Sequence, residues 1–291
     1  MRLALPLAAL LSAGACAQPA DKPGRVPDAR ASRADSVIER AADARPSAAG
    51  DSVAVTSREL ALGDGRVALR VHERAVGGAV PFHALNLHDN EGTSVDAALD
   101  VVRRRGGRVV ELVHSGDRNL AFRVGGQAYA ADPNRVFTDA GRARTLAALG
   151  RDTPQARAAL AAFADSVLAA YAAPRPAVVV TLHNNTPDGY SARSYQPGGE
   201  YAGDAAAVTV HPGSDPDDFF FVTDRGLYDA LAARGFNAVL QDNAAATDDG
   251  SLSVWAAQNG APYVNVEAQH GHREAQARMV DALLDALESG R

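Results

Sequence analysis

The stretch ALNLHDNEGT, residues 84–93, decides the fold prediction because it joins an apolar strand to a helix through a polar turn. Residues 82–87 form an apolar, strand-like run, and residues 94–105 have the periodicity of an amphipathic helix. Strand–helix units of this kind build α/β sheets, whose ligand sites form at the carboxyl ends of the strands. The stretch therefore predicts an α/β fold and directs attention to the polar residues that follow the strand.

The same alternation continues on both sides of this stretch. Further strands are predicted over residues 67–71, 108–113, 120–124, 177–182, 207–210, 219–222, 238–240 and 263–266. Further helices are predicted over residues 140–149, 154–172, 226–234 and 273–287. Interleaved strands and helices indicate a mixed, mostly parallel central sheet with helices on both faces. Since neither a repeat nor a Gly-Pro-rich break follows residue 51, we expect one folded domain over residues 52–291.

The first sixteen residues have the features of a signal peptide. A positive start precedes an apolar run, residues 3–11, that is too short to span a bilayer, and small residues lead into Cys16. This pattern resembles a bacterial lipobox; the alternative is a plain secretory signal cleaved after Ala13-Gly14-Ala15. Residues 17–51 contain almost no large apolar residues, which predicts a flexible tether. We expect a protein of the bacterial cell envelope, lipid-anchored or secreted, whose membrane contact is limited to an N-terminal lipid anchor.

Composition excludes one class of partner. The formal charge of −6 and the absence of a basic stripe argue against nucleic-acid binding, which requires clustered Lys and Arg. Cys16 is the only cysteine, so the chain has no internal disulfide.

His88 and Glu91 follow the strand at 82–87 and are three residues apart. On a tight turn their side chains can converge, and an imidazole with a carboxylate is a ligand pair that zinc accepts. The alternative is a hydrogen bond between the two side chains at the end of a strand. His183, which ends the strand at 177–182, completes a His₂Glu set that leaves a fourth zinc position open for water.

Two further strand ends carry polar residues. In residues 131–138, Arg135 offers a planar fork for a carboxylate and Asn134 adds a donor and an acceptor; the alternative is an ion pair between Asp132 and Arg135. Glu267 ends the strand at 263–266, where burial would raise its pKa and suit it to act as a general base. The nearby His270 and His272 are open to assignment as zinc ligands or proton shuttles.

The order of these features resembles the zinc carboxypeptidase superfamily, and most closely its succinylglutamate desuccinylase and aspartoacylase branch. That branch carries a His-Gly-Asn-Glu zinc motif, matched by residues 88–91, and an Asp-Leu-Asn-Arg-x-Phe substrate motif, matched by residues 132–137. Its third ligand is a His on a later strand, which His183 would supply. Its general base is a Glu, which Glu267 would supply. The matched segments span residues 88–267.

The resemblance implies a zinc-dependent hydrolase that cleaves an amide bond in a carboxylate-bearing substrate, either an N-acyl amino acid or a peptide. The residues implied are His88, Glu91 and His183 for zinc, Glu267 for catalysis, Asn134 and Arg135 for the substrate, and Arg123 as the nearby candidate to stabilise the oxyanion. Two alternatives are an envelope carboxypeptidase or peptidoglycan-peptide amidase of the same superfamily, and a non-catalytic, zinc-containing binding lipoprotein.

Overall fold

A computed structural model of the chain describes residues 52–173 and 175–290. The signal peptide expected in residues 1–16 and the tether expected in residues 17–51 lie outside the described residues. Within them, no helix combines the length and the apolar character that a membrane span requires.

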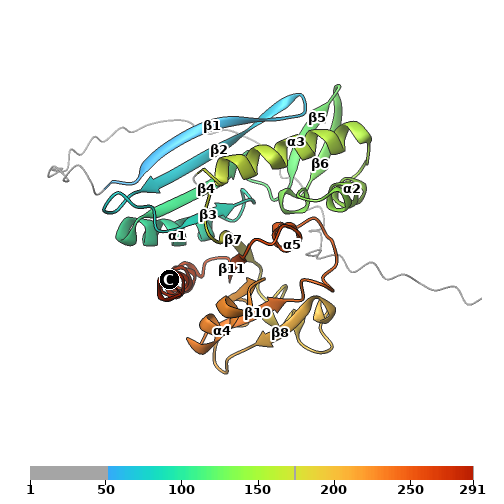
Figure 1. Cartoon of the computed structure of the whole chain (residues 1–291). Coiled ribbons are helices and arrows are strands. Elements are labelled where there is room, and N and C mark those ends of the chain that lie inside the picture. The colour runs from blue at the N-terminus through green and yellow to red at the C-terminus, as the bar shows by residue number, and fades with distance from the viewer. Residues whose placement is uncertain (1–51, 174, 291) are drawn as a thin grey trace, which may run out of the picture.

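A nine-stranded mixed sheet forms the centre of the fold (Figure 1). Its strands run in the order β1-β2-β4-β3-β7-β11-β9-β10-β8, and β4, β3, β7 and β11 are parallel to one another. Antiparallel pairing joins β2 to β4 on one side of this parallel centre and β9 to β11 on the other. The strands are β1 (Ala54–Leu62), β2 (Gly65–Arg74), β3 (His83–Asn86), β4 (Gly107–Val113), β7 (Val179–Asn185), β8 (Ala205–Thr209), β9 (Phe219–Val222), β10 (Asn237–Gln241) and β11 (Tyr263–Gln269), with β5 (Leu120–Val124) and β6 (Gln127–Ala131) in a separate hairpin.

Helices cover both faces of the sheet, as predicted. They are α1 (Gly92–Arg105), α2 (Asp139–Ala148), α3 (Pro154–Tyr171), α4 (Arg225–Ala233), α5 (Leu252–Gln258) and α6 (Arg273–Ser289), with short 3₁₀ turns η1 (Pro133–Arg135), η2 (Ala192–Tyr195) and η3 (Ala202–Asp204). Each helix and strand predicted from the sequence is present. The elements β1, β6 and α5 were not predicted: β1 and β6 are mostly solvent-exposed and lack a clear apolar alternation, and α5 has only seven residues.

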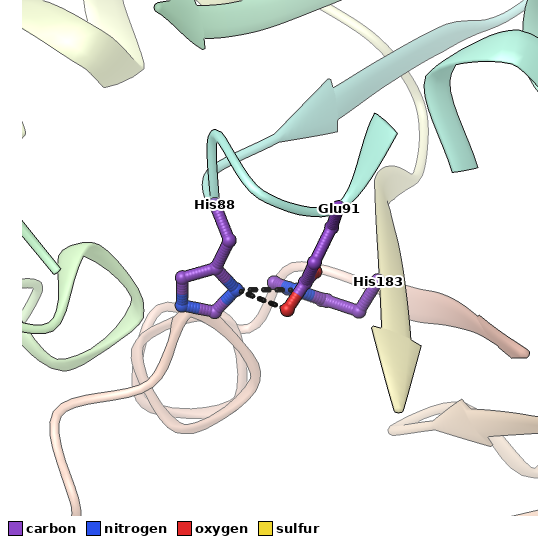
Figure 2. Close-up of side chains that lie close together, drawn as sticks. All are labelled: His88, Glu91 and His183. Carbon is purple, nitrogen blue, oxygen red and sulfur yellow. Dashed lines mark hydrogen bonds and ion pairs between the residues drawn. The ribbon is translucent and has the colours of Figure 1, made fainter. Parts of the chain in front are cut away.

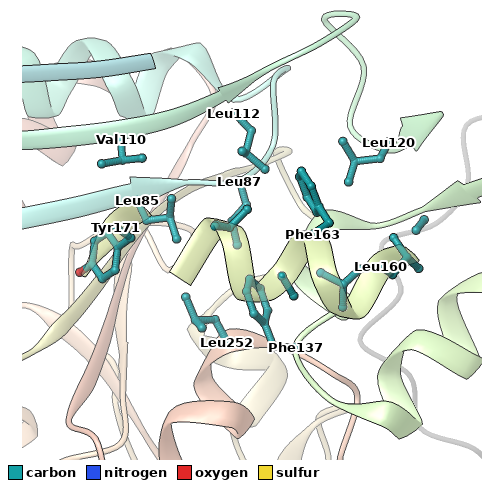
Figure 3. Packing of buried hydrophobic residues seen from close by; sticks show 14 of the residues in the cluster. Leu85, Leu87, Val110, Leu112, Leu120, Phe137, Leu160, Phe163, Tyr171 and Leu252 are labelled. Atoms are coloured by element: carbon teal, nitrogen blue, oxygen red, sulfur yellow. The ribbon is translucent and has the colours of Figure 1, made fainter. Parts of the chain in front are cut away.

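Two apolar layers hold these elements together. Residues of α1, α4 and α6 pack on one face of the sheet, and residues of α3 and α5 pack on the other. On the second face, Leu85 and Leu87 belong to the same buried cluster as Leu160 and Phe163 of α3 (Figure 3). The buried Tyr171 hydroxyl accepts a hydrogen bond from Val180 N at 2.9 Å and donates to the carbonyl of β3 residue 83 at 3.1 Å, which ties the end of α3 to two central strands.

The register of the parallel strands places their carboxyl ends together. Leu182 of β7 lies opposite Asn86 of β3 and Val266 of β11. The next residues along these strands therefore emerge at one edge of the sheet, where open α/β sheets form their ligand sites.

Candidate metal centre

Three buried side chains converge at this edge, as Figure 2 shows. His88 lies in the loop between β3 and α1, Glu91 is the N-cap residue of α1, and His183 lies on β7. Glu91 Oε1 is 2.9 Å from His88 Nδ1, and Glu91 Oε2 is 2.8 Å from His183 Nδ1. The two Nδ1 atoms are 3.0 Å apart, and the relative exposure of the three residues is 1%, 1% and 4%.

The loop geometry leaves the carboxylate of Glu91 available for this cluster. A residue at the N-cap commonly uses its side chain to accept a hydrogen bond from the first helical turn. Here the side chain of Asn184 takes that role instead: its Oδ1 accepts from Ser94 N at 2.8 Å. The hydroxyl of Ser94 donates to the carbonyl of Glu91 at 2.8 Å, so the helix start is stabilised without the Glu91 carboxylate.

The cluster fits a metal ion by its donor set and spacing. In the described part of the chain it is the one group of three or more His, Cys, Asp or Glu residues whose ligand atoms all lie within 4.8 Å of one another. Ligand atoms 2.0–2.1 Å from a tetrahedral zinc lie roughly 3.3 Å from each other. The contacts of 2.8–3.0 Å between the three side chains are close to that spacing.

The charges in the cluster agree with a cation site. Burial alone would raise the pKa of Glu91, but the His88 and His183 imidazoles hold that pKa well below its usual value. Burial lowers the pKa of His183, although Glu91 opposes the shift, so this ring is neutral at pH 7. A carboxylate and a neutral imidazole are the protonation states that metal coordination requires, and the shifts at Glu91 and His183 favour them. At His88 burial favours the neutral ring, but Glu91 and Asp132 raise its pKa, so metal binding would displace a proton from this ring.

His88 is oriented through the ring nitrogen that faces away from the cluster. Asp132, immediately before η1, accepts a hydrogen bond from His88 Nε2 at 2.8 Å. An acceptor at Nε2 fixes the ring and its tautomer and leaves Nδ1 for the metal. At His183 the neighbour of Nε2 is a donor, the Asn134 amide nitrogen at 3.4 Å, so this contact does not select the same tautomer. Asp132 forms ion pairs with His88 and Arg118, and the charge of Arg135 also contributes to the lowered pKa of Asp132.

Arg118 is the arginine at the centre, and the sequence analysis missed it. Its Nη1 donates to Glu91 Oε1 at 2.7 Å and its Nη2 to Asp132 Oδ2 at 3.3 Å, and its side chain is 28% exposed. The residue proposed from the sequence, Arg123, is instead an exposed residue of β5 that donates to the carbonyl of Gly126. We therefore replace Arg123 with Arg118 as the arginine next to the metal ligands.

The loop that carries Arg118 is held by the loop that carries the metal ligands. Asp89 Oδ2 accepts from His114 N and from Gly116 N, both at 2.7 Å. No helical or strand periodicity marks residues 114–119, and an arginine in such a segment looks like any exposed loop residue. The position of Arg118 becomes visible only in the structure, where Asp89, 25 residues before His114, binds the backbone of this segment.

Glu267 on β11 lies next to His183 in the sheet register and faces the same pocket. It is 4% exposed, and its Oε2 accepts a hydrogen bond from Asn265 Nδ2 at 2.9 Å. Burial, reinforced by the charge of Glu91, raises the pKa of Glu267 to about 8. A carboxyl group with a pKa near the working pH is suited to general acid–base chemistry.

Arg135 and Asn134 also line the pocket, together with residues of the second half of the chain. Arg135 Nε lies 3.5 Å from Asp249 Oδ2, and its Nη1 donates to the carbonyl of Asn134 at 3.0 Å. The backbone of Gly250 packs against the carbonyl of Arg135, where a Cβ would come within 2.4 Å of the oxygen. Further pocket residues are Tyr190, Tyr195, Tyr201, Asp204, Phe221, Gln241, Ser251, Ser253 and Tyr263.

The two histidines left open by the sequence lie outside this pocket wall. His272 Nδ1 is 3.0 Å from the carboxylate of Asp218, and the backbone N–H of His270 donates to the carbonyl of Asn185 at 2.9 Å. Neither residue belongs to the candidate metal cluster.

Comparisons with known proteins give structural likenesses only. No protein-family model matches the chain, and no curated protein matches it. Similar solved structures include an aspartoacylase family protein from Mesorhizobium loti (15% identity, TM-score 0.43, covering 81% of this chain and 67% of that chain). Another is a metallo-carboxypeptidase from Burkholderia cenocepacia (11% identity, TM-score 0.43, covering 84% and 66%). A third is the tripeptide-bound cell shape determinant Csd4 from Helicobacter pylori (14% identity, TM-score 0.42, covering 76% and 55%).

The names of the first two proteins are those of the superfamily and branch that the sequence motifs resemble. At these identities and TM-scores, the likenesses carry no argument about the activity of this chain.

Proposed function

We propose that this protein is a zinc-dependent hydrolase that cleaves an amide bond in a carboxylate-bearing substrate, an N-acyl amino acid or a peptide. The observation that carries the proposal is the buried convergence of two imidazole nitrogens and one carboxylate beside Glu267, a second buried carboxyl group whose pKa is raised. His₂Glu sets with an open position are typical of catalytic zinc sites, whereas structural zinc sites are closed by four protein ligands.

His88, Glu91 and His183 would hold the zinc ion. When bound, zinc supplies a Lewis acid that polarises the substrate carbonyl and lowers the pKa of water. Each protein side chain then has a defined task. Asp132 holds the His88 ring through Nε2, so that Nδ1 points at the metal position.

Glu267 acts as the general base. It accepts a proton from the attacking water and returns a proton to the leaving nitrogen. In the metal-free protein the pKa of Glu267 is about 8, and the charge of a bound zinc ion would lower it, which favours the carboxylate form that accepts the proton. Asn265, which donates to Glu267 Oε2, holds the carboxyl group in one orientation.

Arg118 donates hydrogen bonds to the carbonyl oxygen as negative charge develops on it, which is the task of an oxyanion-stabilising group. Its present partners, Glu91 and Asp132, hold the guanidinium beside the metal ligands. Further along the pocket wall, Arg135 and Asn134 bind the carboxylate of the substrate.

Metal content and hydrolysis together test the proposal. We expect one zinc per chain in the wild type, loss of zinc in His88→Ala and in His183→Ala, and unchanged zinc in His211→Ala, a control outside the cluster. Glu267→Gln should keep zinc and lose hydrolysis in a screen of N-acyl amino acids and short peptides, including cell-wall peptides. If Glu267→Gln loses zinc, Glu267 is a ligand and the assigned roles are wrong. If zinc-loaded wild type cleaves no member of the screen, the proposed function is wrong.

A further inference from the structure

The pocket that starts at the metal centre continues across the sheet toward β8. Its wall takes Asn265 from β11, Phe221 from β9, Gln241 from β10 and Asp204 from the turn just before β8. Adjacent strands are about 4.8 Å apart, so β7 and β8, four strand steps apart in the sheet, are separated by roughly 19 Å. The pocket wall therefore extends over several strands beyond the metal cluster, which gives room for a substrate side chain on that side.

The charged side chains along this wall differ in whether an ion pair neutralises them. Arg118 contacts Glu91 and Asp132, and Arg135 contacts Asp249. Asp204 differs from these carboxylates. Its Oδ1 accepts a hydrogen bond from Thr247 N at 2.9 Å, and no arginine or histidine of the described residues forms an ion pair with it. Asp204 therefore contributes a negative charge to the part of the wall that precedes β8.

The neighbours of Asp204 in this wall also favour a ligand that donates hydrogen bonds. Gln241 is 4% exposed and uses its amide nitrogen to donate to Asn243 Oδ1 at 3.1 Å, so the carbonyl oxygen is the group it offers a ligand. Tyr201, at the N-cap of the turn that contains Asp204, adds an aromatic ring to the wall. A carboxylate, an amide oxygen and an aromatic ring are together complementary to an ammonium or guanidinium group.

We propose that Asp204 determines specificity by binding a positively charged side chain of the substrate. The amino acid on the leaving side of the cleaved amide bond would then be long and end in an ammonium or guanidinium group. This inference rests on the proposed function and adds a substrate class to it.

A matched set of substrates tests the inference. The probes are the N-acetyl and alanyl-alanyl derivatives of lysine, norleucine and glutamate; norleucine keeps the side-chain length of lysine but lacks its charge. We expect zinc-loaded wild type to favour lysine over norleucine by roughly 10- to 100-fold in kcat/KM, the range for a hydrogen-bonded charge in an enclosed site. Asp204→Asn should abolish this preference by slowing the lysine substrates, with norleucine substrates unchanged. Asp165→Asn, which alters an exposed carboxylate on α3, is the control and should change neither rate.

The possible failures are distinguishable. If wild type cleaves norleucine or glutamate substrates as well as lysine substrates, or if Asp204→Asn retains the preference, the inference is wrong while amide hydrolysis stands. If no probe is cleaved, calorimetry with free lysine and norleucine decides about the subsite alone. If lysine binds and the binding is lost in Asp204→Asn, the subsite is supported without the proposed reaction. If lysine and norleucine bind equally well, the proposed subsite is wrong.

Discussion

The raised pKa of Glu267 predicts an unusual pH dependence of stability in the metal-free protein. The group titrates at about 8 in the folded protein, against an ordinary value of 4.5. For an acid with a raised folded-state pKa, the folded protein binds more protons than the unfolded chain between these two values. Stability is therefore fully present below about pH 4.5 and is lost as the pH rises toward 8.

Glu267→Gln removes this titration and keeps an acceptor for Asn265 Nδ2. Each pH unit across the window costs the wild type about 1.4 kcal/mol of unfolding free energy. Between pH 5 and pH 7 we therefore expect the stability of the variant relative to wild type to rise by about 2–3 kcal/mol. The residue is only 4% exposed, so solvent screening reduces this value little.

Urea denaturation in the presence of a chelator measures the effect. The free energies of unfolding of wild type and Glu267→Gln are compared at pH 5, 6 and 7, and the change in their difference is the quantity of interest. Glu59→Gln, a change at an exposed position on β1, is the control and should show a difference that does not vary with pH. A constant difference for Glu267→Gln, or one that favours wild type more strongly as the pH rises, would refute the claim that Glu267 is held protonated by burial.

Substitutions at three further positions probe the groups around the candidate metal ligands and the pocket wall. Asp132→Asn weakens the partner of His88 Nε2, and we expect zinc affinity, measured by chelator competition, to fall by about 10- to 100-fold; unchanged affinity would remove Asp132 from the metal centre. Asp89→Ala removes both hydrogen bonds that hold the Arg118 loop, so turnover of the best substrate should fall by roughly tenfold with zinc content unchanged. Asp89→Asn should restore most of that turnover, which a general loss of structure would not allow. Gly250→Ala places a Cβ against a backbone carbonyl at a φ of +87°, and thermal unfolding should report a loss of about 1–3 kcal/mol; a variant as stable as wild type would contradict the close approach.

The predicted parts of the site share one origin, the ends of buried parallel strands. The apolar runs that end before His88, His183 and Glu267 are visible in the sequence, and parallel strands must bring their carboxyl ends to one edge. The convergence of the three candidate ligands follows from the fold class together with the residue types.

The parts that sequence reasoning missed depend on contacts between loops. The position of Arg118 follows from two hydrogen bonds to Asp89, and the role of Asp132 follows from one bond to His88 Nε2. Neither contact leaves a periodic pattern, because a loop has no repeat that relates spacing to direction. Arg123 was named only as a nearby candidate without a motif match, and its side chain is exposed on the β5–β6 hairpin.

The division of the site between strands and loops bears on how the protein would select its substrate. The candidate metal ligands and the proposed general base lie on or beside the central strands, whose register fixes them to one another. The groups that would recognise the substrate are supplied by loops and turns after β6, before β8 and after β10. Substitution of Asp204 in the turn before β8 should therefore alter substrate choice while zinc affinity stays unchanged, since Asp204 is not one of the three candidate ligands. A loss of zinc in Asp204→Asn would show instead that the two ends of the pocket are coupled through the sheet.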